Sequence, residues 1–166
     1  MQAEAALRAE RIESAPARHH FRLRTLHEAS DVARSISSYF PDPLAAFYGL
    51  SELLINAIEH GNLSITYEEK VELLRHGKWQ EEIERRLSLP ANRGKYVRAQ
   101  VSITPSEVRV SITDEGHGFS WREFAKFSPE RRTSIAGRGI ATTIGLGFAN
   151  INYSDTGNAV ECLLVR

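Results

Sequence analysis

Apolar and polar residues alternate in two neighbouring segments of the chain, residues 96–104 and 107–115. An alternation with a period of two is typical of strands that bury one face. A proline and a serine at residues 105–106 stand between the segments and favour a turn. We therefore predict a β-hairpin here, a further strand at residues 21–26, and a second hairpin near the end of the chain that turns at residues 156–158.

Apolar residues recur every three or four positions over residues 44–60, which predicts a long amphipathic helix. Gly61 is placed to end this helix, because glycine readily adopts the left-handed conformation that terminates helices. A shorter helix is predicted to begin with Ser30 or Asp31 as its N-cap and to end at about residue 39.

Charged residues dominate residues 67–89, but two apolar stripes run through this segment at helical spacing. Gly77 separates the stripes, which predicts a short helical hairpin within an insertion at about residues 64–95. We predict that the hairpin is a docking surface for a protein partner or a second copy of the chain. A structural flap over the sheet edge fits the same pattern. The stripes consist of Tyr67, Val71 and Leu74, and of Trp79, Ile83 and Leu87.

The charges of the chain balance, with 21 lysine and arginine residues against 21 aspartate and glutamate residues. Bulk electrostatics therefore gives no attraction to nucleic acid or to an anionic membrane, and we expect neither as a partner. Cys162 is the single cysteine, which excludes an intrachain disulfide and fits a reducing, cytoplasmic location. No apolar run reaches the roughly 18 to 20 residues that span a bilayer, and we expect no signal peptide.

The predicted helix over residues 44–60 places Glu52, Asn56 and Glu59 on one face, at i, i+4 and i+7. Mg²⁺ prefers hard oxygen ligands and needs few from the protein when phosphates supply others, so the amide oxygen of Asn56 is a candidate metal ligand. Glu52 lies one turn earlier and is placed to accept a proton from an attacking hydroxyl group or water. Taken alone, the pair also fits solvated helix residues.

Two glycine-containing segments complete the candidate site. Asp114 follows a predicted buried strand and precedes Gly116 and Gly118, whose small size lets backbone approach a ligand closely. Taken alone, this segment also fits a simple turn. The sequence Gly137-Arg138-Gly139-Ile140 lies at the start of a predicted short helix at residues 138–146, where free backbone N–H groups are available to phosphate oxygens. Arg138 can add a charge-assisted contact to the terminal phosphate.

In this order, the segment from Glu52 to Asn62, Asp114-x-Gly116-x-Gly118 and Gly137-Arg138-Gly139-Ile140 resemble the N, G1 and G2 boxes of the GHKL superfamily of ATPases. Within that superfamily they are most similar to the stand-alone anti-sigma-factor serine kinases. The resemblance covers about residues 21–166 apart from the insertion. It implies that ATP and Mg²⁺ bind, that Glu52 is the general base, and that Asp114 accepts the amino group of adenine.

The resemblance also implies an α+β fold, a two-layer α/β sandwich in which helices cover one face of a mixed, mostly antiparallel sheet. We assign residues 1–18 to a tail or linker and residues 19–166 to one domain. Residues 119–136 show no regular period and end beside the glycines of the third box, so we predict a lid over ATP there.

The leading functional hypothesis is a protein serine kinase that phosphorylates a small antagonist protein and captures a sigma factor or a similar target. A second hypothesis is a nucleotide-dependent binding module associated with a two-component receiver, with little or no phosphotransfer. A third is the catalytic domain of a histidine kinase acting in trans. The sequence lacks the long dimerisation helices that carry a phosphoacceptor histidine, which counts against the third. The insertion departs from the simple serine kinases and weakens the sigma-factor assignment, not the assignment of ATP.

Overall fold

The computed structural model describes residues 16–118, 121 and 150–165. The helices within these ranges are α2 (Leu26–Ser37), α3 (Pro43–Asn56), the π-helix η1 (Ala57–Asn62), α4 (Tyr67–Arg75) and α5 (Trp79–Ser88). The strands are β1 (Ala17–Leu23), β2 (Val97–Ile103), β3 (Glu107–Thr113), β4 (Asn150–Tyr153) and β5 (Ala159–Val165).

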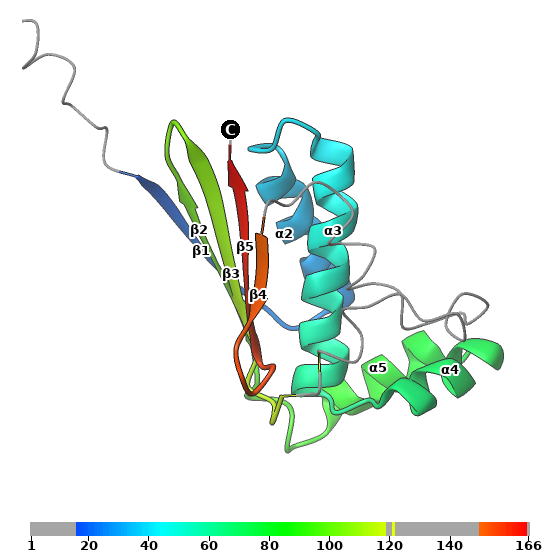
Figure 1. The fold of residues 1–166 in the computed structure, drawn as a ribbon. Coiled ribbons are helices and arrows are strands. Elements are labelled where there is room, and N and C mark those ends of the chain that lie inside the picture. The colour runs from blue at the N-terminus through cyan, green and yellow to red at the C-terminus, as the bar shows by residue number, and fades with distance from the viewer. Residues whose placement is uncertain (1–15, 119–120, 122–149, 166) are drawn as a thin grey trace, which may run out of the picture.

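The strands form a five-stranded sheet in the order β1-β2-β3-β5-β4, and every described pairing is antiparallel. Alternation sets the register of the central strands, because Val108, Val110 and Ile112 of β3 are buried while the residues between them are half-buried. The helices α2 and α3 lie on one face of the sheet (Figure 1). The α+β two-layer sandwich is therefore confirmed, and no parallel pairing occurs among the described strands.

The core lies between α2, α3 and the covered face of the sheet. Its fully buried members include residues of α2, α3, η1, β2 and β3, which is the arrangement expected when a helix layer packs on a half-buried sheet. No helix in the described part of the chain combines the length and apolar character needed to span a bilayer. The large side chains at the centre of this core are Ile36, Leu50, Leu53, Leu54, Ile58, Val97, Val101 and Ile112.

The predicted hairpins are confirmed, whereas the start of the domain differs from prediction. The first strand runs from Ala17 to Leu23, so it begins within the segment we assigned to the tail and ends before residue 26. The next helix begins after Thr25, not at Ser30 or Asp31. Thr25 accepts the backbone N–H of Glu28, and the Glu28 side chain accepts the backbone N–H of Thr25 at 3.0 Å, which is a capping box.

The helix predicted over residues 44–60 is present but changes geometry part of the way along. Asp42 caps it by accepting the N–H of Ala45 at 3.0 Å, and the α-helix ends at Asn56. The chain continues as the π-helix η1, in which the Leu63 N–H donates to the carbonyl of Ile58 at 2.9 Å. Gly61 therefore lies inside the π-helix and does not end the helix, which corrects the prediction.

The predicted helical hairpin is confirmed as α4 and α5, and Gly77 between them has a φ of +66°. Figure 1 shows the pair beyond the end of α3. Ile83 is only 1 % exposed, so part of the α5 stripe packs into the domain. Trp79 is half-buried, and its indole N–H donates to Glu59 at 2.8 Å. Trp79 is therefore not the exposed anchor that would favour a docking surface.

Several predictions concern residues outside the described part of the chain. They are the lid at residues 119–136, of which only Trp121 is described, and the third box from Gly137 to Ile140. The short helix predicted at residues 138–146 also lies outside the described residues.

Candidate functional site

A small pocket that is open to solvent lies between the C-terminal end of α3 and the sheet. Two of the residues that we predicted for the site, Asn56 and Asp114, line it together although they are far apart in the sequence. The remaining described lining is largely apolar. The lining residues are Leu53, Asn56, Ala57, Ile112, Asp114, Tyr153, Gly157, Asn158, Ala159 and Val160.

Asp114 stands directly after β3 and is 8 % exposed. Its backbone N–H donates to the carbonyl of Asn158 at 3.0 Å, and its Oδ1 accepts the N–H of Gly116 at 2.8 Å. Its Oδ2 accepts no hydrogen bond from a described residue. Burial raises the pKa of Asp114 to about 6, although the Gly116 hydrogen bond and the charge of Lys95 oppose the rise. A buried carboxylate with one unused oxygen beside a pocket is suited to accept an N–H from a ligand.

Two glycines let the chain close around Asp114. A Cβ at Gly61 would lie 2.3 Å from Asp114 Cγ, and a Cβ at Gly116 would lie 2.2 Å from the carbonyl oxygen of Gly61. Both positions therefore exclude any side chain. Gly118 has a φ of +80°, and a Cβ there would lie 1.8 Å from the carbonyl oxygen of Thr156. In the described residues, Gly116 and Gly118 thus shape the loop beside the pocket.

Replacing Gly61 with alanine is expected to push the Asp114 carboxylate out of its buried position. The pKa of Asp114 should then fall from about 6 toward the ordinary aspartate value of about 3.9. Carbon-detected NMR of the carboxyl group across a pH titration measures this change. Gly94→Ala is the matched control, because a Cβ at Gly94 would meet nothing within 4 Å. An unchanged Asp114 pKa in Gly61→Ala would contradict the role given to Gly61.

Asn56 is the last residue of α3 and is 9 % exposed. It lines the pocket, and its side-chain amide makes no hydrogen bond with a described residue. Buried amides are normally hydrogen-bonded, so an amide that faces a pocket without a partner points to a ligand there. The donor chemistry fits Mg²⁺, since an amide oxygen is a hard ligand that can act together with phosphate oxygens.

Glu52 lies one turn before Asn56 on α3 and is half-buried. It is not among the described residues that line the pocket. It lies close enough to Tyr153 to affect that side chain, because the pKa of Tyr153 is raised by burial and by the charges of Cys162 and Glu52. Glu52 precedes Asn56 by one helical turn, so it lies on the same side of α3 as Asn56, which lines the pocket.

Glu59 does not line the pocket beside Asn56, contrary to the single face that we predicted for Glu52, Asn56 and Glu59 on a regular α-helix. It is 0 % exposed, and its carboxylate accepts Lys70 Nζ and Trp79 Nε1 from the helical hairpin. The π-helix changes the angular spacing of side chains after Asn56, and the hairpin supplies donors in a different direction.

The sequence analysis did not predict two features of the site, a stacked pair of aromatic rings and a hydrogen bond from the backbone of Glu115 to Asn62. Tyr153 lines the pocket, and Trp121 stacks on it with ring centroids 5.1 Å apart. Asn62 accepts the backbone N–H of Glu115 through its Oδ1 at 2.8 Å. The alternation of the last hairpin places Ile151 and Tyr153 on one face and could have identified Tyr153. No sequence signal pointed to the contact between Asn62 and Glu115.

Comparison with known proteins gives no identification. No protein-family model matches this chain, and no curated protein matches it.

Proposed function

We propose that the chain is an ATP-binding regulatory protein serine kinase of the anti-sigma-factor type, acting in the cytoplasm on a small antagonist protein. The observation that carries this proposal is the pocket in which Asn56 and Asp114 meet. One residue offers an amide oxygen and the other a carboxylate oxygen, and neither atom is used by the described part of the protein. The amide oxygen is a ligand suited to Mg²⁺, and the carboxylate oxygen can accept a hydrogen bond from the amino group of adenine.

The chemistry of the pocket lining supports an adenine base. The exocyclic amino group of adenine donates to the unused oxygen of Asp114. The flat faces of the base pack against the apolar lining, which includes Leu53, Ile112 and Val160. Ligand pockets commonly combine an apolar lining with a few fixed polar groups that set orientation.

Asn56 would hold Mg²⁺ together with phosphate oxygens of the nucleotide. A metal ion held there would neutralise charge on the phosphates and align them for transfer. In the reaction, the serine hydroxyl oxygen of the antagonist protein forms a bond to the γ-phosphorus while the bond to the β,γ-bridging oxygen breaks and ADP leaves. The Glu52 carboxylate takes the hydroxyl proton.

Asp114→Asn is expected to weaken ATP binding by about 1 to 3 kcal/mol, because the amide replaces one of the two acceptor oxygens with a donor. Isothermal titration calorimetry with Mg-ATP measures the loss. The affinity of the natural protein should also fall below about pH 6, as Asp114 becomes protonated. Ser106→Ala, in the exposed turn between β2 and β3, is a control that should bind as the natural protein does.

Asp114→Asn should not destabilise the protein at pH 7 in the absence of nucleotide. The folded protein has a raised Asp114 pKa, so it binds more protons than the unfolded chain between about pH 4 and 6. Stability due to this group is therefore greatest at low pH and is lost as pH rises through that window. An asparagine carries no such pH-dependent cost and keeps an oxygen for Gly116. Unchanged ATP affinity in Asp114→Asn would overturn the adenine assignment.

A nucleotide-dependent binding module with little or no phosphotransfer, associated with a two-component receiver, is the second candidate. It is favoured by the position of Glu52, which does not line the described pocket. Incubation of the protein with labelled ATP and cell lysate distinguishes the serine kinase from the binding module. A serine kinase yields acid-stable, base-labile phosphate on another protein, whereas a binding module retains ATP and labels none.

A further inference from the structure

Glu59 is a fully buried carboxylate that the proposed reaction does not use. It accepts Lys70 Nζ from α4 and Trp79 Nε1 from α5, the latter at 2.8 Å, and its Oε1 lies 3.0 Å from His60 Nε2. Burial favours the protonated form, but the His60 hydrogen bond and the Lys70 charge hold the pKa of Glu59 below its ordinary value. The group is therefore an anion tied to both helices of the hairpin.

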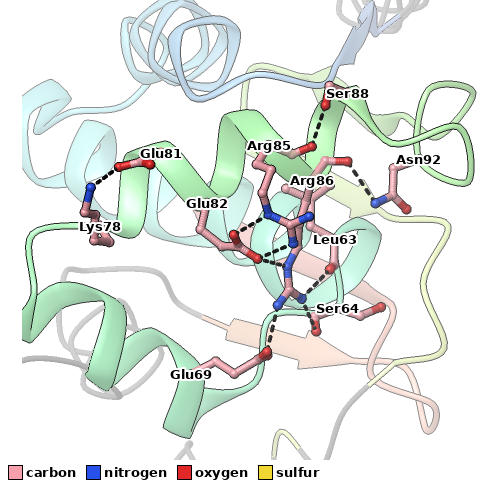
Figure 2. Close-up of polar contacts among 10 residues, drawn as sticks. All are labelled: Leu63, Ser64, Glu69, Lys78, Glu81, Glu82, Arg85, Arg86, Ser88 and Asn92. Atoms are coloured by element: carbon pink, nitrogen blue, oxygen red, sulfur yellow. Dashed lines mark hydrogen bonds and ion pairs between the residues drawn. The ribbon is translucent and has the colours of Figure 1, made fainter.

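The hairpin holds the far end of η1 as well, through Arg86 of α5 (Figure 2). The Arg86 guanidinium donates to the carbonyl oxygens of Leu63 and Ser64 at 3.0 and 2.9 Å. It also pairs with Glu69 at 2.7 Å and Glu82 at 2.6 Å, so ion pairs within the hairpin fix its position. The segment from Glu59 to Ser64 is thus held by the hairpin at both ends.

The opposite side of this segment forms part of the support for the nucleotide pocket. Gly61 packs directly on the Asp114 carboxylate, and Asn62 holds the loop after β3 through the N–H of Glu115. A π-helix is uncommon and often occurs at functional sites. Its position here depends on contacts from outside the helix, and the hairpin supplies several of them.

We propose that Glu59 is a positioning residue that couples the inserted hairpin to the nucleotide pocket through η1. When the hairpin is docked on Glu59, Gly61 and Asn62 hold Asp114 and its loop in the geometry that binds the base. By thermodynamic reciprocity, nucleotide binding must then stabilise the hairpin to the same extent. The effect on ATP affinity rests on the proposed function, whereas the effect on the loop around Asp114 does not.

Two conservative variants test the coupling in the full chain. Glu59→Gln keeps the shape of the side chain and removes its charge, and Trp79→Phe keeps an aromatic ring but removes the N–H that Glu59 accepts. Glu72→Gln is the matched control, because Glu72 is exposed on α4 and pairs with Arg75. The measurements are calorimetry with Mg-ATP and amide hydrogen exchange with and without the nucleotide.

Both test variants are expected to bind Mg-ATP at least about fivefold more weakly than the natural protein. Their amides at Asn62, Glu115 and Gly116 should exchange faster without nucleotide, while Glu72→Gln matches the natural protein in every measurement. In the natural protein, ATP should slow exchange in α4 and α5, and Glu59→Gln should abolish that slowing. A purely structural role would not produce this nucleotide-dependent signal.

The proposal is overturned if the folded variants keep natural ATP affinity and natural exchange at the loop amides. Should Glu59→Gln fail to fold, Trp79→Phe gives the same comparison. If the natural protein binds no ATP, the proposed function fails, and the exchange measured without nucleotide still decides whether Glu59 positions the loop.

Discussion

Lys70→Met is expected to lower the free energy of unfolding by about 3 to 5 kcal/mol, because it removes the cationic partner of a buried carboxylate. Glu59 is 0 % exposed, so it cannot recover the lost interaction from water. The indole N–H of Trp79 is a neutral donor and does not replace the charge of Lys70. Urea unfolding followed by circular dichroism measures the loss.

The pH dependence of the same variant provides a second check. The folded-state pKa of Glu59 is held low, so the stability that this group contributes is present above its unfolded pKa and is lost as pH falls through its folded pKa. Removing Lys70 raises the folded pKa and should move acid destabilisation to higher pH. The control is Lys78→Met, since Lys78 and its partner Glu81 are both exposed and such pairs contribute about 0 to 1 kcal/mol. Equal stability losses in the two variants would contradict the importance assigned to the buried pair.

Glu52→Gln is expected to reduce phosphotransfer by about 10² to 10⁴ in rate while leaving ATP affinity nearly unchanged. The amide keeps the shape of the side chain on α3 but cannot accept the proton of the attacking hydroxyl. Single-turnover transfer of labelled phosphate to the antagonist protein measures the rate, and calorimetry measures binding.

Asn56→Ala provides the contrast, because loss of the metal ligand should weaken Mg²⁺-dependent ATP binding. Glu68→Gln, on the exposed side of α4, should change neither rate nor affinity. If Glu52→Gln transfers phosphate at the natural rate, Glu52 is not the base. If it loses ATP binding as Asn56→Ala does, the substitution has damaged α3 and the base assignment loses its support.

Local patterns in the sequence were sufficient to predict most of the fold. The alternation that buries Val108, Val110 and Ile112 defines a strand by itself, and Gly77 marks the turn of the helical hairpin. We placed the start of α2 at Ser30 or Asp31, although the threonine at residue 25, followed three residues later by glutamate, is the signature of a capping box and marks the true start. The first residues of β1 could not be predicted from the sequence, because Ala17 and Arg18 belong to the sheet through backbone pairing with β2 and carry no strand pattern of their own.

The site was predictable where it depends on spacing along the chain and unpredictable where it depends on tertiary contacts. Asn56 and Asp114 were predicted from their segments to belong to one site, and the structure places both at one pocket. The environment of Glu59 could not be predicted, because it requires the π-helix and two donors from the inserted hairpin. Gly61 looked like a helix terminator, whereas its place is set by the Asp114 carboxylate beside it.

The most direct test of the pocket as a nucleotide site is an NMR titration of the isotope-labelled full chain with Mg-ATP. The amides of Asn56, Gly61, Asp114 and Gly116 should shift in a saturable manner, and those of the exposed face of the sheet, such as Gln100, should remain in place. Shifts centred on that exposed face, or no saturable shifts at the pocket, would contradict the assignment of Asn56 and Asp114 to ATP.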